Sequence, residues 1–377
     1  MNVDRAPSLV MWEVTRTCKP AYGHRRVDAN RRRDRGELTT DEGFRLIDQV
    51  RALGPPSSPS ATARAHPVQA GPPHFVLTGG DPMRRPDLVE LVRYAAGAGL
   101  AVALTPGGTA AATPARLAAL KDAGLSCVIA SLDGPDPGTH DAFRGVRGSY
   151  AWTMGLIEAT IDLGLPLQIH STISRMTLAA LHATAARVAQ FPLTLWALVF
   201  LIRTGRSAGL EQISAEECER ALNYLYDLSR TSPFEINAAE APHYQRVLWQ
   251  RDEERRRAGL AAAAVDRRPQ WLAPRDVNDG NGFVFIDHLG NICPGGFLSV
   301  ARGNVRTESL ADVYRADEVF TRLRNANALL DKCGRCRFRA ICGGSRARAF
   351  AATGAVMASD PLCAYEPGPC TEPLVTR

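Results

Sequence analysis

Residues 74–82 read HFVLTGGDP, an apolar run that ends in a glycine turn. Runs of this kind alternate along the chain with amphipathic alanine- and leucine-rich segments, which is typical of βα units around a parallel sheet. The predicted strands are 8–15, 74–79, 101–106, 126–133, 166–173 and 193–202. The predicted helices are about 39–53, 86–99, 114–123, 149–164, 177–190 and 214–231. Six strands with right-handed crossovers predict an α/β fold, an incomplete parallel (βα)6 barrel.

The chain has 377 residues, enough for one large and one small unit. We expect the partial barrel to occupy 1–250, with the Pro-, Ala- and Ser-rich segment 55–73 as a surface insertion. Residues 251–280 are predicted to be a linker. The smaller unit, 281–377, is expected to begin with a hairpin and continue with a short helix near 309–315.

The composition, 45% apolar and 22% charged, is that of a globular protein. Neither an apolar run of membrane-spanning length nor a secretory signal is evident, so we expect a cytoplasmic protein without a membrane partner. The net charge of +6 comes largely from arginine, with a dense group between residues 25 and 35. Such a group usually marks a solvated loop, and because no nucleic-acid motif accompanies it we expect no nucleic-acid partner.

Nine cysteines, clustered rather than spread, favour metal binding in a reducing compartment over disulfides. The metal-ligand pattern is Cys333-x2-Cys336-x5-Cys342, followed by Cys363. Glycines at 334, 343 and 344 allow the chain to fold tightly around one centre. The spacing favours an iron–sulfur cluster, since structural zinc usually takes two separated Cys-x2-Cys pairs; zinc is the alternative.

The sequence does not decide which cysteine is the fourth metal ligand. Cys363 is the first candidate, and Cys293, in the predicted hairpin, is the alternative. Cys370 is a third candidate near the end of the chain. Cys127 and Cys218 lie in a predicted strand and a predicted helix, so we expect them to be core residues.

In parallel barrels the chemistry lies at the carboxyl ends of the strands, and three such loops carry distinctive residues. These are Thr17 to Arg25, Thr78 to Pro82 and Ser131 to Pro135. Together with the C-terminal cysteines they resemble the radical S-adenosylmethionine (SAM) enzymes that carry a SPASM or twitch extension. The branch that matures haem precursors and peptides is most similar, through Ser131-Leu132-Asp133-Gly134, Glu240-Ala241-Pro242-His243-Tyr244 and Cys342-Gly343-Gly344-Ser345-Arg346.

The resemblance implies cofactor-binding roles for several residues. Gly79, Gly80, Asp81 and Pro82 match the glycine-rich turn that receives the amino group of SAM, and a carboxylate there suits an ammonium group. Ser131 and Asp133 match positions that contact the ribose or carboxylate of SAM; an ordinary turn after a strand is the alternative. His170 and Thr172 would face one side of their strand and line the cavity, unless His170 is a core residue.

One departure from the resemblance is decisive. The family places three cysteines as Cys-x3-Cys-x2-Cys in the first loop, where this chain has Cys18, Tyr22 and Arg25. A single thiolate cannot hold a 4Fe-4S cluster, and arginine is permanently cationic. Reductive cleavage of SAM is therefore not expected.

The sequence thus predicts a biosynthetic tailoring enzyme that has lost the SAM-cleaving cluster, keeps an auxiliary 4Fe-4S site and acts on a small molecule or peptide. Two other chemistries are open. Haem in the barrel mouth would make the protein an oxidoreductase, with Tyr22, His24, His170 or His243 as axial ligand. Alternatively, SAM would serve as an ordinary electrophile, with Tyr22 or His24 as general acid or base. A non-catalytic protein that binds a substrate or a companion biosynthetic protein is the remaining alternative.

Overall fold

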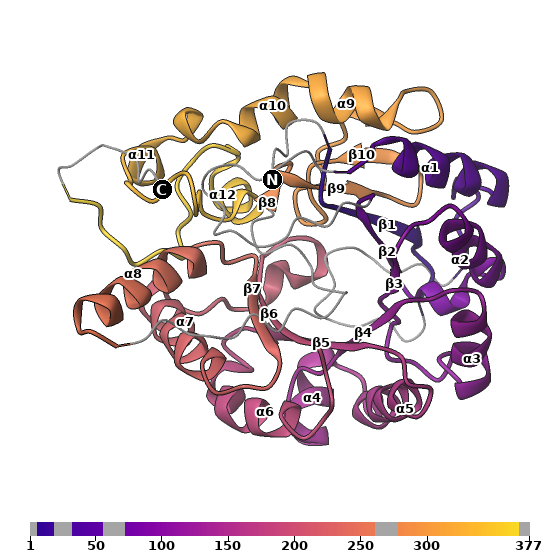
Figure 1. Ribbon diagram of the computed structural model, residues 1–377, viewed down its shortest axis with the longest axis horizontal. Coiled ribbons are helices and arrows are strands. Elements are labelled where there is room, and N and C mark those ends of the chain that lie inside the picture. Colours follow the sequence, from indigo (N-terminus) through magenta and orange to yellow (C-terminus); the bar gives the residue numbers. More distant parts are fainter. Residues whose placement is uncertain (1–5, 19–31, 56–71, 261–277, 369–377) are drawn as a thin grey trace.

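The computed structural model describes residues 6–18, 32–55, 72–260 and 278–368. Seven parallel strands follow one another in chain order across the sheet (Figure 1). They are β1 (Leu9–Thr15), β2 (His74–Gly79), β3 (Val102–Leu104), β4 (Cys127–Ser131), β5 (Leu167–Ile173), β6 (Leu195–Phe200) and β7 (Glu235–Ala239). The predicted class, an incomplete parallel α/β barrel, is confirmed, with β7 as one more strand than the six predicted.

The sheet continues beyond β1 into the C-terminal part of the chain. β9 (Gly282–Ile286) pairs with β1 in parallel, and β8 (Asn278–Asp279) pairs with β9. β10 (Asn291–Cys293) returns antiparallel to β9 and then pairs with β11 (Gly303–Asn304), which confirms the predicted hairpin. The order is β11-β10-β9-β1-β2-β3-β4-β5-β6-β7, so the sheet is open between β7 and the C-terminal strands.

Helices surround the strands in Figure 1. Those that follow the strands of the barrel are α1 (Thr40–Ala52), α2 (Leu88–Gly97), α3 (Pro114–Asp122), α4 (Pro137–Arg144), α5 (Ser149–Asp162), α6 (Leu181–Val188), α7 (Ala215–Ser229) and α8 (Tyr244–Arg257). The C-terminal ones are α9 (Leu310–Ala316), α10 (Glu318–Arg324), α11 (Asp331–Gly334) and α12 (Arg346–Thr353). The short 3-10 helices are η1 (Pro82–Arg84), η2 (Leu178–Ala180), η3 (Gly205–Gly209) and η4 (Ala326–Ala328).

Local sequence explains where several helices begin. Capping boxes open α1 and α7, in which the hydroxyls of Thr39 and Ser214 each accept a bond from a backbone N–H three residues on. Thr113 caps α3, and Pro114 occupies its first turn as predicted. The predicted helices agree with the observed ones to within a few residues, whereas α4, α8, α10, α11 and α12 were not predicted.

The two faces of the barrel strands differ in burial. On β1, Val10, Trp12 and Val14 alternate into the main core beneath the helices. The intervening residues Leu9 and Met11 belong to a separate small apolar cluster, whose other members are Val76, Ala101, Ala103, Cys127 and Ile129. This second cluster forms an apolar floor on the inner face of the barrel.

The N-terminal end of α12 contacts strands on both sides of the opening in the sheet. Arg348 donates to the carbonyl of Phe200 at the end of β6, while the backbone N–H of Ala347 donates to Asp279 of β8. Residues 281–377 therefore share the barrel's sheet through β9 and close its gap through α12. The boundaries at 250 and 280 stay a prediction. No helix in the described ranges is long and apolar enough to cross a membrane.

Candidate functional site

The inner face of the barrel becomes polar and accessible toward the carboxyl ends of the strands. Side chains here are only half-buried, in contrast to the apolar floor below them. This ring consists of Thr78, Thr105, Ser131, His170, Thr172 and Asn237. We call it the barrel mouth, and its position is where a parallel barrel places its ligands.

The glycine turn after β2 packs directly on the end of β1. A Cβ on Gly79 would lie 2.4 Å from the carbonyl oxygen of Thr15, and one on Gly80 would lie 2.4 Å from that of Arg16. Only glycine fits at these two positions. The turn thereby holds the first loop against the second at the barrel mouth.

The carboxylate of Asp81 is fully buried and committed to loop structure. Oδ1 accepts from the backbone N–H of Met83 at 3.2 Å and from that of Gly107 at 3.1 Å, and Oδ2 accepts from the Thr109 hydroxyl at 2.6 Å. Asp81 therefore fixes the β3 loop beside the glycine turn. Pro82, also buried, begins η1.

Asp133 is likewise held by protein groups. Its Oδ2 accepts from Arg144 Nε at 2.9 Å, and its Oδ1 accepts from the backbone N–H of Thr172 at 2.7 Å. Its own backbone N–H donates to His140 Nδ1. Of the two residues predicted to contact SAM here, Ser131 faces the barrel mouth, while the Asp133 carboxylate joins β4, β5 and α4.

The two histidines predicted to bind a cofactor lie in different surroundings. His170 is half-buried in the barrel mouth, and burial lowers its pKa to about 4. His243 is fully buried at the start of α8, where its Nε2 lies 3.3 Å from Cys218 Sγ. The structure does not bring His243 to the barrel mouth. Tyr22 and His24 lie outside the described residues.

Four of the C-terminal cysteines lie around one pocket. Cys333, Cys336, Cys342 and Cys363 line one pocket that encloses about 370 Å³, part of it open to solvent. The other lining residues are Arg246, Lys332, Phe338, Arg339, Gly343, Gly344 and Tyr365. Cys293 is buried on β10 and is not among the lining residues, while Cys127 and Cys218 are core residues.

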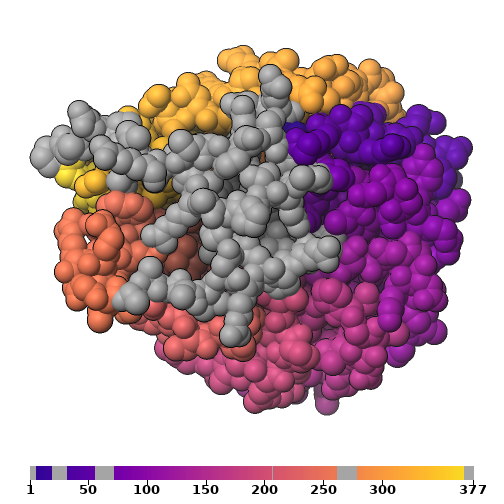
Figure 2. Space-filling view, in the orientation of Figure 1, coloured from indigo at the N-terminus to yellow at the C-terminus, as the bar shows by residue number. Residues whose placement is uncertain are grey.

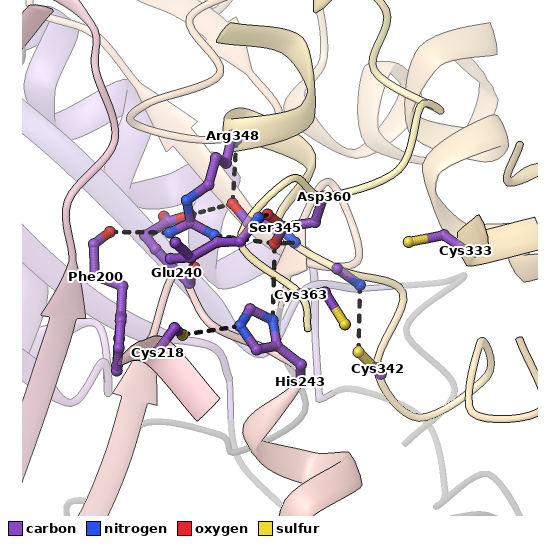
Figure 3. Close-up of polar contacts among 12 residues, drawn as sticks. Phe200, Cys218, Glu240, His243, Cys333, Cys342, Ser345, Arg348, Asp360 and Cys363 are labelled. Atoms are coloured by element: carbon purple, nitrogen blue, oxygen red, sulfur yellow. Dashed lines mark hydrogen bonds and ion pairs between the residues drawn. The ribbon is translucent and has the colours of Figure 1, made fainter. Parts of the chain in front are cut away.

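The chain around these thiols is shaped by glycine. Gly343 and Gly344 both have left-handed φ values, of 69° and 67°. This turn directs the backbone N–H of Gly344 to Cys342 Sγ at 3.4 Å (Figure 3). A Cβ on Gly334 would lie 2.3 Å from the carbonyl oxygen of Leu329, so glycine is also required between the first two cysteines.

Burial and one nearby positive charge act in opposite directions on the thiols of the pocket. Burial raises the pKa of Cys363 to about 11 and also raises the pKa values of Cys336 and Cys342. The positive charge of Arg246 acts in the opposite direction on all three. Arg246 stacks on Tyr365, with its guanidinium carbon 5.0 Å from the ring centre. The C-terminal segment lies beside α8 (Figures 1 and 2). Trp249 of α8 contacts Phe338, with their ring centres 5.5 Å apart.

A buried polar network joins this pocket to the barrel (Figure 3). Arg348 pairs with Asp360 at 3.0 Å and also donates to the carbonyl of Glu240. The backbone N–H of Ser345 donates to Asp360, and its hydroxyl donates to Glu240 Oε2 at 3.0 Å. Ser345 follows Cys342 by three residues and Asp360 precedes Cys363 by three, so the network fixes both cysteine loops.

Glu240 has an unusual conformation and titration. Its φ of 59° lies in the left-handed region, which is rare for a residue other than glycine and recurs at functional sites. Burial, reinforced by the nearby charge of Asp279, raises the pKa of Glu240 to about 8. Neither Arg348 and Asp360 nor the role of Glu240 is predicted from the sequence. The only sequence signal for a role was position: Arg348 and Asp360 lie near the cysteines, and Glu240 lies directly after β7.

Comparison with known proteins places this fold in a family. Residues 55–183 match the sequence profile of the radical SAM superfamily. A relative from Nitratidesulfovibrio vulgaris, named AdoMet-dependent heme synthase, is 36% identical over 95% of this chain and 92% of its own length. The chain belongs to the radical SAM superfamily, whose cofactors are an iron–sulfur cluster and SAM.

Two further relatives and one solved structure are also similar to this chain. A Methanosarcina barkeri protein, also named AdoMet-dependent heme synthase, is 33% identical over 96% of this chain and 98% of its own length. A PqqA peptide cyclase of Rhodopseudomonas palustris is 28% identical over 96% and 88%. Among solved structures, Streptococcus suis SuiB bound to S-adenosylmethionine has a TM-score of 0.68 at 14% identity, covering 96% of this chain and 78% of that one. This last similarity concerns the fold.

Proposed function

We propose that this protein is a biosynthetic tailoring enzyme that carries an auxiliary iron–sulfur cluster and does not cleave SAM reductively. The observation that carries the proposal is the convergence of Cys333, Cys336, Cys342 and Cys363 on one pocket. We assign these four thiols as the cluster ligands, in preference to Cys293. When bound, the cluster would supply one-electron redox chemistry or a coordination position at iron.

The residues present fit a cluster by donor type and spacing. Within the described ranges, no three His, Cys, Asp or Glu side chains stand close enough to hold one metal ion. A tetrahedral zinc site, with Zn–S bonds of about 2.3 Å, would need its sulfurs within about 3.8 Å of one another. Four thiols around one pocket, no three of them close enough to hold a single ion in the described structure, agree better with a centre that contains several irons.

The first loop supports the absence of reductive SAM cleavage. Only Cys18 remains of the three cysteines that the family motif requires. The glycine turn at Gly79 and Gly80 is nevertheless intact and packs on β1. A SAM molecule bound there would act as an electrophile rather than as a radical source.

The substrate class follows from the relatives' names and from the barrel mouth. Two relatives that match nearly the whole chain are named heme synthases, and one at lower identity is a peptide cyclase. We therefore propose a tetrapyrrole or its precursor as the small molecule, ahead of a peptide. A haem-binding oxidoreductase is the second candidate function, favoured by the accessible imidazole of His170. A non-catalytic protein with a companion enzyme would share the fold but leave bound substrate unchanged.

The test is an anaerobic assay of the reconstituted protein with dithionite and SAM. We expect no 5′-deoxyadenosine and no methionine above a protein-free control, while the iron–sulfur content is retained. Stoichiometric 5′-deoxyadenosine would overturn the proposal. Calorimetric titration of SAM on the same sample decides whether the glycine turn still binds it.

A further inference from the structure

His170 differs from every other histidine in the described part of the chain. All eight histidines except His24 and His66 fall in the described ranges. Of these, His170 alone is half-buried on the inner face of the barrel. No hydrogen bond or ion pair engages its ring nitrogens within the described structure; only its backbone carbonyl bonds, to the N–H of Leu132.

The other described histidines have structural surroundings. His140 Nδ1 accepts from the backbone of Asp133, and His288 Nδ1 lies 3.2 Å from Glu13 Oε2. His243 contacts Cys218 within the buried network. His182 lies exposed on α6 against Tyr224, and His74 is buried at the amino end of β2, away from the mouth.

The surroundings of His170 keep a ring nitrogen available. Burial lowers its pKa to about 4, with the negative charge of Asp133 acting the other way. The imidazole is therefore neutral at physiological pH, and a neutral imidazole is a metal ligand. Asp133 cannot compete for the same ligand site, because Arg144 and the Thr172 backbone hold its carboxylate.

The neighbours of His170 suit a large planar ligand. Ser131 lies beside it on β4, and Ala197 is its partner on β6. Both are small; Ile129, two residues before Ser131 on β4, belongs to the apolar floor, whereas Gln168 is buried two residues before His170 on β5. A ligand that is apolar across part of its face and bears a metal at its centre would match the apolar floor on one side and the His170 imidazole on the other.

We propose that His170 is the axial ligand to the iron of a metallated tetrapyrrole bound in the barrel mouth. This inference rests on the tetrapyrrole substrate of the proposed function and deepens it by naming the binding residue. One coordinate bond forms, from a His170 ring nitrogen to the iron, and it replaces a weakly held water. No electron transfer is required.

Spectroscopic titration tests the inference without any catalytic assay. Haemin is added to the purified wild-type protein and to the His170→Ala variant, and difference spectra in the Soret region are recorded with the unliganded protein as reference. We expect a shifted, histidine-ligated Soret band in the wild type. We expect the variant to lose that band and at least about tenfold in affinity.

Two controls separate ligation from folding. His182→Ala removes an exposed histidine outside the barrel mouth and should leave the titration unchanged. His170→Gly should regain the wild-type spectrum when free imidazole is added, which a merely misfolded variant would not do. Metal-free coproporphyrin should bind the wild type and His170→Ala equally, because it has no iron to ligate.

The outcomes separate failure of the His170 assignment from failure of the proposed tetrapyrrole substrate. If the wild type binds no tetrapyrrole at all, the tetrapyrrole substrate and the ligand assignment both fail. If the wild type and His170→Ala bind haemin with the same affinity and the same spectrum, only the assignment of His170 fails. Loss on His170→Ala with recovery by imidazole in His170→Gly supports both.

Discussion

Arg348 Nη1 lies 3.0 Å from Asp360 Oδ2, and neither side chain is more than 1% exposed. Through its Nη2, Arg348 also donates to the carbonyl of Phe200, the last residue of β6, and to that of Glu240, which follows β7. The ion pair thus connects the segment before Cys363 to the barrel. It is a fully buried polar link between the two predicted units of the chain.

Breaking this pair should be costly. Arg348→Met leaves the Asp360 carboxylate buried without its partner, and we expect a loss of about 3–5 kcal/mol in the free energy of unfolding. Urea denaturation of the two proteins measures it. Arg175→Met, which breaks an exposed pair with Glu217, should leave the midpoint nearly unchanged. Equal effects of the two variants would show that the buried pair has no special role.

The fourth cluster ligand can be tested by matched substitutions. Cys363→Ser should lower the iron and acid-labile sulfide content, because Cys363 lines the pocket with the other three thiols. Cys293→Ser should retain both, since Cys293 lies outside that lining. Cys333→Ser combined with Cys336→Ser should abolish iron binding. If Cys293→Ser lost iron and sulfide while Cys363→Ser retained both, the fourth ligand would be Cys293 on β10.

Stability should depend on pH through Glu240. Its pKa rises from an ordinary 4.5 to about 8 on folding, so between these values the folded chain binds more protons than the unfolded chain. Stability from this group therefore falls as pH rises through that window. Glu240→Gln should flatten the fall, leaving the smaller contribution of Asp279, whose pKa burial raises to about 6. Melting temperatures from about pH 5 to about pH 9 measure it.

The matched control for this titration is Glu90→Gln on the exposed face of α2. It should leave the pH dependence as in the wild type. A Glu240→Gln protein with the same slope as the wild type between pH 5 and 8 would mean that Glu240 ionises normally.

Restoring the family motif offers a gain-of-function test. The double variant Tyr22→Cys, Arg25→Cys recreates Cys-x3-Cys-x2-Cys with Cys18. After anaerobic reconstitution we expect its iron content to rise by about four per chain, because three thiolates suffice for a cluster with one open iron. Unchanged iron content would indicate that loss of the two cysteines is not what removed the cluster.

The parallel barrel could be predicted from the sequence because β1 to β6 are apolar runs separated by clear helical periodicity. β7 escaped prediction because its sequence, Glu235 to Ala239, contains a charged and an amide side chain among alanines. α8 escaped because it is strongly charged and reads as a surface segment. β7 is stabilised by its pairing with β6, and α8 is stabilised by the packing of its Trp249 on Phe338. Neither tertiary contact can be read from the local sequence.

The cysteine pocket could be predicted because a metal that prefers soft ligands requires cysteine side chains. Soft thiolates at close spacing identified the cysteine pocket before the fold was known. The buried side chains were not predictable, since sequence does not show that Asp133 meets Arg144 or that His243 meets Cys218. Distinguishing His170 from His243 as a ligand required the three-dimensional burial of each.

The most direct test of the central claim is the metal content of anaerobically purified protein, measured with its absorption spectrum. The account predicts about four irons and four acid-labile sulfides per chain, with a broad shoulder near about 400 nm. About eight irons, with SAM-dependent formation of 5′-deoxyadenosine, would contradict the loss of the first cluster. Stoichiometric zinc without sulfide would contradict the assignment of the cysteine pocket itself.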